Sequence, residues 1–387
     1  MSLARPRAKR PGDAAIASNP LSISSVSERV PMKQFHSLVV ADKHQETRDS
    51  VRISLDVPEV LREEFAFQAG QHLPVQIERE GRKLRRTYSI CSQQGEWPLQ
   101  IGVRVQPGGQ FSEFAASELV AGDTLDVMPP NGQFHAVPDA SNEKQYLGFA
   151  AGSGITPVLS IIATLLHQEP HSRFALFYGN RTQRTTMFID DLFALKNQYP
   201  ERLQLHFLFS REEQEFEVAS GRLDESKVRQ LVDLFCSGTS PDEAFVCGPD
   251  TMISSVEAAL LDLGMDAASV HVERFGVPRK SGQAPLVSTG STTDMTKVTV
   301  VMDGHKKSFE MPRTGVNIVD AAAEQGVDLP YSCKGGVCAT CRTHVQKGEV
   351  EMATNYGLEP WEVDKGFVLA CQCTPLSDEV LLNYDKT

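Results

Sequence analysis

The chain has 387 residues, and at ~150 residues per domain this length indicates two or three domains. Hydrophobic residues make up 41% and charged residues 23%, an ordinary globular composition that excludes a disordered, collagen-like or coiled-coil chain. A net charge of -12 argues against a nucleic-acid partner, and no run approaches the ~18 apolar residues of a membrane span. Five of the eight cysteines crowd the last fifth of the chain, which favours a cytoplasmic protein with a metal site over a disulfide scaffold.

Residues 1–31 carry five basic and two acidic side chains and no apolar signal-peptide core. We expect a disordered tail, although the early basic residues also resemble an organelle transit peptide. From residue 32 to 141 the chain changes to short β-type runs broken by Gly, Pro and Asn, which predicts an antiparallel barrel. The predicted strands cover residues 35–43, 51–57, 73–78, 85–90, 99–105 and 124–130.

Two motifs of the predicted barrel suit a phosphate-bearing ligand. The first is Arg86-Thr87-Tyr88-Ser89, in which an arginine can pair with a phosphate, a tyrosine can stack on a flat ring and a serine can bond a ring or ribitol atom. The second, Gly108-Gly109-Gln110-Phe111-Ser112, is a glycine turn that opens a predicted helix, where backbone N–H groups can bind an anion. Alone each motif is weak, but together in one small barrel they favour a pyrophosphate.

Residues 142–276 alternate buried strands with helical stretches, which predicts βαβ units and a parallel sheet. Strands are expected at residues 146–151, 174–180, 203–209 and 244–248, and helices at 156–168, 187–198 and 252–264. The glycines of Gly152-Ser153-Gly154-Ile155-Thr156 follow one strand, and Cys247-Gly248-Pro249 ends another. Because ligands bind at the carboxyl ends of parallel strands, both motifs should line one dinucleotide crevice.

Ser210-Arg211 follows the strand at residues 203–209, and its arginine, which Arg222 could assist, suits a phosphate. In the reductase superfamily that the chain resembles, as set out below, a Ser-Arg at this place is similar to the 2′-phosphate site of NADPH-dependent members. Four nearby carboxylates would oppose a phosphate, and an acidic residue on a free 2′-hydroxyl would favour NADH. The choice between NADPH and NADH therefore stays open, with NADPH the prediction.

A segment rich in Gly, Pro, Ser and Thr, residues 277–296, is predicted to be a flexible linker before a third unit at 297–387. That unit contains Cys333, Cys338 and Cys341 in the spacing C-x4-C-x2-C, with 29 residues between Cys341 and Cys371. This is the plant-type [2Fe-2S] spacing, whereas zinc sites favour two C-x2-C pairs. Cys373 would share one strand face with Cys371, so geometry alone does not choose between them as the fourth ligand.

The motifs R-x-Y-S, G-G-x-x-S, A-G-S-G-I-T-P and C-G-P, in this order, resemble the ferredoxin–NADP reductase superfamily. With the ferredoxin-like third unit, residues 32–387 resemble the reductase subunits of multicomponent phenylacetyl-CoA oxygenases, in segments such as LRRTYSI, FYGNRT, HVERF and PYSCKGGVCATC. The resemblance implies an antiparallel FAD-binding barrel (32–141), a parallel α/β nicotinamide-binding domain (142–276) and a β-grasp ferredoxin domain (297–387).

The same resemblance implies residue roles. Arg86, Tyr88 and Ser89 would hold FAD, and Gly109 and Ser112 its pyrophosphate. Thr156 would lie between flavin and nicotinamide, Cys247 near the nicotinamide ring, and Glu273 and Phe275 near the flavin. The V-L-x-C-Q segment assigns Cys371 as the fourth cluster ligand and leaves Cys373 spare.

The implied activity is electron transfer from NAD(P)H through FAD and a [2Fe-2S] cluster to a diiron oxygenase, most naturally a phenylacetyl-CoA epoxidase. The linker would let the ferredoxin domain move between flavin and partner. The alternatives are the same chemistry serving another oxygenase, hydroxylase or desaturase, or a redox sensor without turnover. The sensor would need a damaged nicotinamide site, whereas Thr156 and Cys247 are both present.

Overall fold

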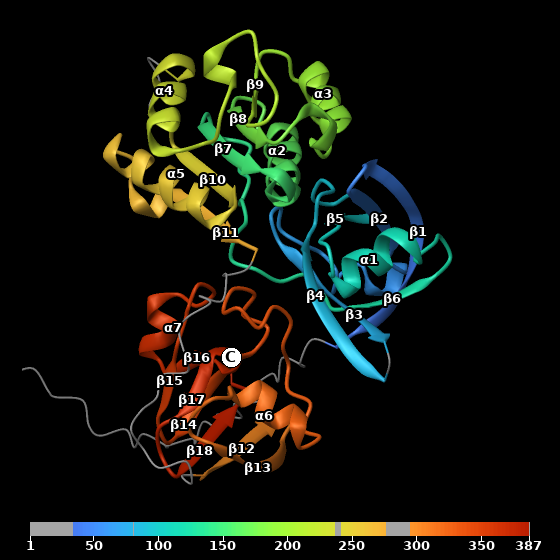
Figure 1. Ribbon diagram of the computed structural model, residues 1–387, viewed down its shortest axis with the longest axis vertical. Coiled ribbons are helices and arrows are strands. Elements are labelled where there is room, and N and C mark those ends of the chain that lie inside the picture. The colour runs from blue at the N-terminus through green and yellow to red at the C-terminus, as the bar shows by residue number, and fades with distance from the viewer. Residues whose placement is uncertain (1–33, 80, 237–240, 276–294, 387) are drawn as a thin grey trace, which may run out of the picture.

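A computed structural model of the chain describes residues 34–79, 81–236, 241–275 and 295–386. Three units, each built on its own sheet, follow one another along the chain (Figure 1). The predicted tail lies outside the described residues, as does the predicted linker except for its last two residues, which belong to a strand. In the part of the chain that the structure describes, no helix is long and apolar enough to cross a membrane.

The first unit is a six-stranded antiparallel sheet in the order β4-β3-β6-β1-β2-β5. A bridge between Ile90 and Ile101 joins the end of β4 to β5, so the sheet curls into the predicted barrel. Alternate side chains fill its interior, among them Leu38, Ile53 and Val103, each worth about 1.5–3 kcal/mol on burial. Its elements are β1 (His36–Thr47), β2 (Ser50–Asp56), β3 (His72–Arg79), β4 (Arg82–Ser89), β5 (Leu99–Arg104), α1 (Gln110–Ser117) and β6 (Thr124–Val127).

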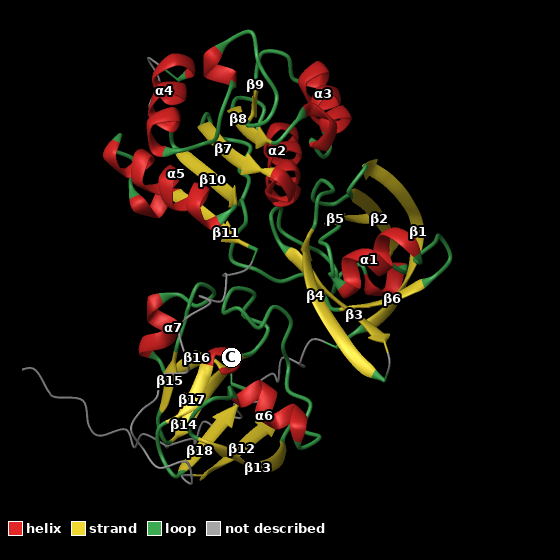
Figure 2. Cartoon of the chain, in the orientation of Figure 1, coloured by secondary structure: helices red, strands yellow, loops and turns green. Residues whose placement is uncertain are grey.

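The second unit is a five-stranded parallel sheet in the order β11-β10-β7-β8-β9 with helices on both faces (Figure 2). In β8, Leu176 and Tyr178 belong to the core under α2, whereas Phe177 belongs to the core under α4 and α5, because strand side chains alternate between faces. The predicted βαβ architecture is confirmed. Its elements are β7 (Gln145–Ala151), α2 (Ile155–Gln168), β8 (Arg173–Asn180), α3 (Ile189–Gln198), β9 (Leu203–Phe209), α4 (Glu225–Phe235), β10 (Glu243–Gly248), α5 (Asp250–Asp262) and β11 (Val270–Arg274).

An ionic cluster fastens the edge of this sheet. The Glu243 carboxylate at the start of β10 accepts hydrogen bonds from His271 Nε2 of β11 at 3.0 Å and from Lys144 Nζ at 2.6 Å. The hydrogen bond from His271 has the largest effect on the pKa of Glu243 and lowers it, and the bond from Lys144 also lowers it. Together they outweigh partial burial, which raises the pKa, and the result is a pKa of about 2. The cluster therefore holds β11, which carries Glu273 and leads to Phe275, against β10.

The third unit combines a mixed sheet, β13-β12-β18-β14-β16, with the pair β15-β17 and two short helices. Its strands are β12 (Met295–Met302), β13 (His305–Pro312), β14 (Arg342–Lys347), β15 (Val350–Met352), β16 (Phe367–Leu369), β17 (Cys373–Pro375) and β18 (Glu379–Asn383). Its helices are α6 (Ile318–Glu324) and α7 (Pro360–Asp364). Short 3-10 turns occur at Glu59–Leu61, Gly152–Gly154, Gln183–Thr185, Glu217–Ala219, Ala267–Ser269 and Ala370–Gln372.

Candidate functional site

A cleft of about 1490 Å³ lies between the barrel and the carboxyl ends of the parallel strands. This is the edge at which doubly wound sheets bind ligands. Seven of the predicted residues line the cleft: Gly152, Gly154, Ser210, Arg211, Gly248, Pro249 and Phe275. The lining also includes arginines that sequence analysis passed over, Arg48, Arg104 and Arg181, together with Arg222.

The two glycine motifs meet at the base of this cleft. A Cβ on Gly154 would lie 2.1 Å from the Cys247 carbonyl oxygen, so only glycine allows the two segments to approach this closely. Gly152 has φ +56°, and a Cβ there would lie 2.7 Å from Arg104 Nη1. The close packing at Gly154 and the positive φ at Gly152 account for both glycines, and residues 152–154 line the cleft, where a dinucleotide would lie.

Thr156 and Cys247 are buried directly behind these glycines. Thr156, in the first turn of α2, donates from Oγ1 to the Ser153 carbonyl at 3.0 Å. Burial, and then the nearby Glu273, raise the pKa of the Cys247 thiol well above its ordinary value, so it stays protonated at neutral pH. Thr156 follows the turn after β7 and Cys247 lies near the end of β10, but neither is among the described residues that line the cleft. Their predicted places beside the nicotinamide stay predictions.

Glu273 joins the nicotinamide side of the site to the cysteine loop. It pairs with Cys247 across β10 and β11 and is partly buried. This burial, and then the charge of Cys333, raise its pKa to about 8. Two residues further on, Phe275 is about half exposed (48%) in the cleft lining.

Strand β4 carries the R-x-Y-S motif. Arg86 is exposed and donates one N–H to the Arg85 carbonyl at 2.7 Å, which leaves further donors for a ligand. The Tyr88 ring packs on Phe111 with centroids 5.1 Å apart, and burial raises its pKa, so the phenol is neutral. Arg86 and Tyr88 share one face of the strand. A guanidinium that can donate hydrogen bonds to a phosphate therefore lies beside an aromatic ring that can stack on a flavin, and FAD needs both. Ser89 at the end of the strand is buried.

The glycine turn before α1 differs in detail from the expectation. The Ser112 hydroxyl is buried, accepts from the Gln106 N–H at 3.1 Å and donates to the Gly109 carbonyl at 3.1 Å, so it fastens the turn. Phe111 is a core residue behind Tyr88, and Gln110 is exposed. Of this motif, the backbone of the turn and Gln110 are the parts placed to meet a pyrophosphate, and that role stays a prediction.

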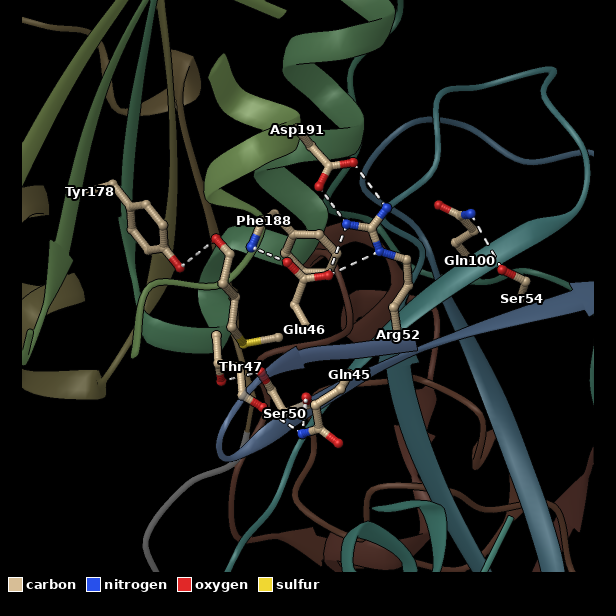
Figure 3. A network of polar contacts seen from close by, with 11 residues as sticks. Gln45, Glu46, Thr47, Ser50, Arg52, Ser54, Gln100, Tyr178, Phe188 and Asp191 are labelled. Carbon is tan, nitrogen blue, oxygen red and sulfur yellow. Dashed lines mark hydrogen bonds and ion pairs between the residues drawn. The ribbon is translucent and has the colours of Figure 1, made fainter. Parts of the chain in front are cut away.

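A partly buried polar network joins strands β1 and β2 of the barrel to the start of α3 in the parallel-sheet unit (Figure 3). Arg52 of β2 bonds Asp191 of α3 with both terminal nitrogens, at 2.9 Å for Nη1, and bonds Glu46 of β1 at 2.8 and 3.1 Å. Glu46 also accepts the Phe188 N–H at 2.8 Å. The Phe188 ring and Thr156 both crowd Gly102 of β5, where an added Cβ would lie within 2.8 Å of each. The network therefore sets the position of Thr156 relative to the barrel.

The cysteine loop brings four thiols together in two pairs. Cys333 Sγ accepts the N–H groups of Gly335 at 3.3 Å and Cys338 at 3.4 Å, and the Cys338 thiol together with these N–H groups lowers the pKa of Cys333 to about 5. Cys338 Sγ accepts the Cys333 N–H at 3.4 Å and the Thr340 hydroxyl at 3.2 Å. The donors surrounding the sulfurs are those that stabilise thiolates bound to iron.

The second pair is Cys341 and Cys371, whose thiols interact directly and perturb each other's pKa. Cys373 is fully buried in β17, where it pairs with Met352 of β15, and burial raises its pKa. Among the described residues no three His, Cys, Asp or Glu side chains are arranged around a single ion. Two thiol pairs suit a centre in which each of two irons takes two cysteines. The residues therefore fit a [2Fe-2S] cluster.

Backbone strain accompanies this loop. Lys334 and Ala339 adopt positive φ values of 49° and 50°, which non-glycine residues rarely do. Gly336 has φ +75°, and an added Cβ would lie 2.9 Å from the Thr354 carbonyl oxygen. At Gly335 the nearest atom to an added Cβ is the Cys333 carbonyl oxygen at 3.8 Å. Of the two glycines, Gly336 is the one that the loop requires.

Three segments of the chain match family models. Residues 37–136 match an oxidoreductase FAD-binding domain, residues 149–258 an oxidoreductase NAD-binding domain and residues 300–376 a 2Fe-2S iron-sulfur cluster binding domain. Together with the cleft and the paired thiols, these matches define a modular flavin and iron–sulfur oxidoreductase that uses a nicotinamide nucleotide.

Whole-chain relatives narrow the class. A component of the 1,2-phenylacetyl-CoA epoxidase of Escherichia coli (strain K12) is 45% identical over 354 residues, 92% of this chain and 99% of that protein. The ferredoxin reductase component of 3-ketosteroid-9-alpha-monooxygenase from Rhodococcus rhodochrous is 34% identical over 90% of this chain and 96% of its own length. The chain belongs to this family of oxygenase reductase components.

The solved structure of phthalate dioxygenase reductase has the same fold, with a TM-score of 0.56 and 23% identity over 90% of this chain and 98% of that one. The predicted architecture and the predicted cofactors, FAD, NAD(P)H and a [2Fe-2S] cluster, are confirmed at this level.

Proposed function

We propose that the protein is the NADPH-dependent reductase of a diiron oxygenase that acts on phenylacetyl-CoA. The observation that carries the proposal is the 45% identity to a phenylacetyl-CoA epoxidase component across nearly the whole of both chains. The runner-up acceptor is a steroid hydroxylase, because the ketosteroid monooxygenase reductase is 34% identical over a similar span. None of the described cysteines forms a disulfide, which suits a reducing compartment, and we infer a cytoplasmic location.

When bound, FAD would supply two-electron hydride chemistry and a [2Fe-2S] cluster held by Cys333, Cys338, Cys341 and Cys371 would supply one-electron chemistry. The protein's residues bind and orient these groups. Arg86 would pair with a flavin phosphate and Tyr88 would cover the flavin ring. Thr156 and Cys247 would exclude water around the nicotinamide, and Glu273, which pairs with Cys247 across β10 and β11, would lie beside them.

The preference for NADPH is proposed from the charge of the cleft rim. Ser210 and Arg211 follow β9, their backbone N–H groups bond the carbonyls of Asn180 and Arg181, and Arg222 lies on the same lining. Acidic residues also line the cleft, namely Asp49, Glu113, Asp224 and Asp250, but the carboxylates that the sequence marked as opposing a phosphate do not. Glu212 accepts the Gln183 N–H at 2.7 Å, and none of the four carboxylates at 212, 213, 215 and 217 is among the described residues of the lining. Arg181, Arg211 and Arg222 line the same cleft as Ser210, and guanidinium groups of this kind suit a 2′-phosphate.

Turnover with the two nucleotides tests this preference. For Arg211→Ala we expect kcat/KM for NADPH to fall by about tenfold or more, the value of a charge-assisted hydrogen bond, with the NADH value unchanged. Arg229→Ala is the matched control, because Arg229 lies on α4 and pairs with Glu225 and Asp262 away from the cleft. Equal loss for both nucleotides, or better use of NADH by the wild type, would contradict the proposal.

The acceptor is tested by reconstitution with purified oxygenases. We expect NADPH-driven epoxidation of phenylacetyl-CoA when the chain is mixed with the phenylacetyl-CoA oxygenase, at a rate well above that with a 3-ketosteroid oxygenase. Preferential turnover of the ketosteroid system would favour the runner-up. Bleaching of the flavin without transfer to either oxygenase would point to another acceptor.

A further inference from the structure

The outer face of strand β4 meets the segment that leads into the cysteine loop. Leu84 and Tyr88 face the barrel core, so strand alternation turns Lys83, Arg85 and Thr87 to the other face. Each of these three side chains contacts the third unit. Lys83 and Arg85 pair with Asp328, at 3.3 and 3.1 Å, and the Thr87 hydroxyl bonds that of Ser332, the residue before Cys333. Figure 1 shows the loops above α6 beside β4.

Arg85 is the centre of this contact. Its side chain is only 6% exposed, which is unusual for arginine. The guanidinium donates to the Leu329 carbonyl at 3.3 Å and to Gln76 Oε1 at 2.7 Å, in addition to Asp328. It also lies over the Tyr331 ring, 4.8 Å from its centroid. Planar stacking and several donors in a fixed fork are what arginine supplies and lysine does not.

We propose that the outer face of β4, centred on Arg85, is a dock that holds segment 328–332, and with it the cluster loop, against the flavin-binding barrel. Arg85 is then a positioning residue for electron transfer from flavin to cluster. The inference rests on the proposed function, and it adds to that function a defined intramolecular interface next to the flavin motif. Asn131 supports it from a neighbouring loop, with Nδ2 3.4 Å from the Cys338 carbonyl.

The chemistry of the dock makes it reversible. Lys83 and Asp328 are more than half exposed, and the contacts are polar, so salt weakens the interface. A partner oxygenase can therefore reach the cluster when segment 328–332 leaves β4. The flavin motif would stay intact, because Arg86 and Tyr88 lie on the opposite face of the strand.

The test compares Arg85→Met with Arg79→Met in the purified holoprotein. Arg79, on β3, pairs with Glu118 and lies over Phe114, both in the barrel. Stopped-flow absorbance separates flavin bleaching by NADPH from bleaching of the cluster. For Arg85→Met we expect an unchanged first phase and a second phase slower by about 10- to 100-fold, the factor for one buried charge-assisted hydrogen bond. Arg79→Met should leave both phases unchanged.

Small-angle X-ray scattering gives a readout independent of activity. Arg85→Met should increase the maximum dimension of the particle, as high salt should for the wild type, while Arg79→Met should not. If Arg85→Met does not retain flavin, Asp328→Ala replaces it as the test of the dock. Asp328 is the exposed partner of Arg85 on the ferredoxin side, so its loss should not disturb the flavin-binding barrel. This variant should slow the cluster phase by about two- to fivefold at low salt.

An unaltered cluster phase and unaltered scattering for Arg85→Met, or for Asp328→Ala when it replaces that variant, would overturn the dock. If instead the wild-type cluster is never reduced after its flavin, the proposed function itself has failed.

Discussion

The buried network at Arg52 permits a quantitative prediction for the joint between barrel and parallel sheet. In Arg52→Met, the Glu46 carboxylate, whose side chain is 8% exposed, would keep the Phe188 N–H as a partner but lose its counter-ion. An uncompensated buried charge of this kind costs about 3–5 kcal/mol. Asp191 is a third exposed, so its loss of a partner adds little. We expect Arg52→Met to lower the free energy of unfolding by about 3 kcal/mol.

The assay is urea unfolding followed by far-UV circular dichroism, with the rate of flavin reduction by NADPH measured alongside. Because the network sets the position of Thr156 relative to the barrel, that rate should fall with stability. If the cost comes from the orphaned charge, adding Glu46→Gln should restore about 2 kcal/mol, since the neutral amide can still accept the Phe188 N–H.

A double variant destabilised by the full sum of both single changes would refute this reasoning. Arg229→Met is the matched control, because Arg229 bridges two exposed carboxylates, and we expect it to leave stability unchanged.

Three further predictions concern the cluster loop and the sheet edge. Cys371→Ser should abolish the visible absorbance and the electron paramagnetic resonance signal of the cluster, while Cys373→Ser should keep both; loss of the signals in Cys373→Ser alone would reverse the ligand assignment. Gly336→Ala should reduce cluster content, because its φ of +75° and the carbonyl 2.9 Å from an added Cβ exclude a side chain, whereas Gly335→Ala should not. Iron and sulfide analysis of the two proteins checks this, and equal content would contradict it. The pKa of Glu243 is lower in the folded chain than its ordinary 4.5, so its stabilisation is complete above pH 4.5 and disappears as the pH falls towards about 2. Glu243→Gln should therefore cost about 2–3 kcal/mol at pH 7 and much less at pH 3, and urea midpoints that differ equally at both pH values would argue against this origin.

The barrel strands, and the strands and helices predicted for the parallel-sheet unit, could be recognised because each is a local pattern. Helices α4 and α7 and strands β11 and β14–β18 were not predicted. The runs at residues 99–105 and 124–130 alternate clearly enough to predict β5 and β6, and the apolar stretch after Gly154 predicts α2. The motifs at Thr156, Cys247 and the cysteines were recognisable for the same reason, since short spacings carry their chemistry. The structure brings Gly154 and Cys247 together as the parallel sheet requires.

Contacts between residues far apart in the chain could not be predicted from the sequence. Arg52 and Asp191 are 139 residues apart, and Arg85 and Asp328 are 243 apart, and nothing local marks either arginine as buried. Ser112 is the opposite case. From the sequence, a serine after a glycine turn is predicted to bind a ligand, but in the structure its hydroxyl bonds the Gln106 N–H and the Gly109 carbonyl within the turn. Composition likewise could not show that Glu212 turns its carboxylate to a backbone N–H.

The central claim is that this single chain converts a nicotinamide hydride into single electrons at an iron–sulfur centre. The most direct measurement is an anaerobic titration of the holoprotein with NADPH, followed by electron paramagnetic resonance. We expect the signal of a reduced [2Fe-2S] cluster to grow with added NADPH in the wild type and to be absent in Cys371→Ser, which should still bleach its flavin. A bleached flavin with no cluster signal in the wild type would contradict the account.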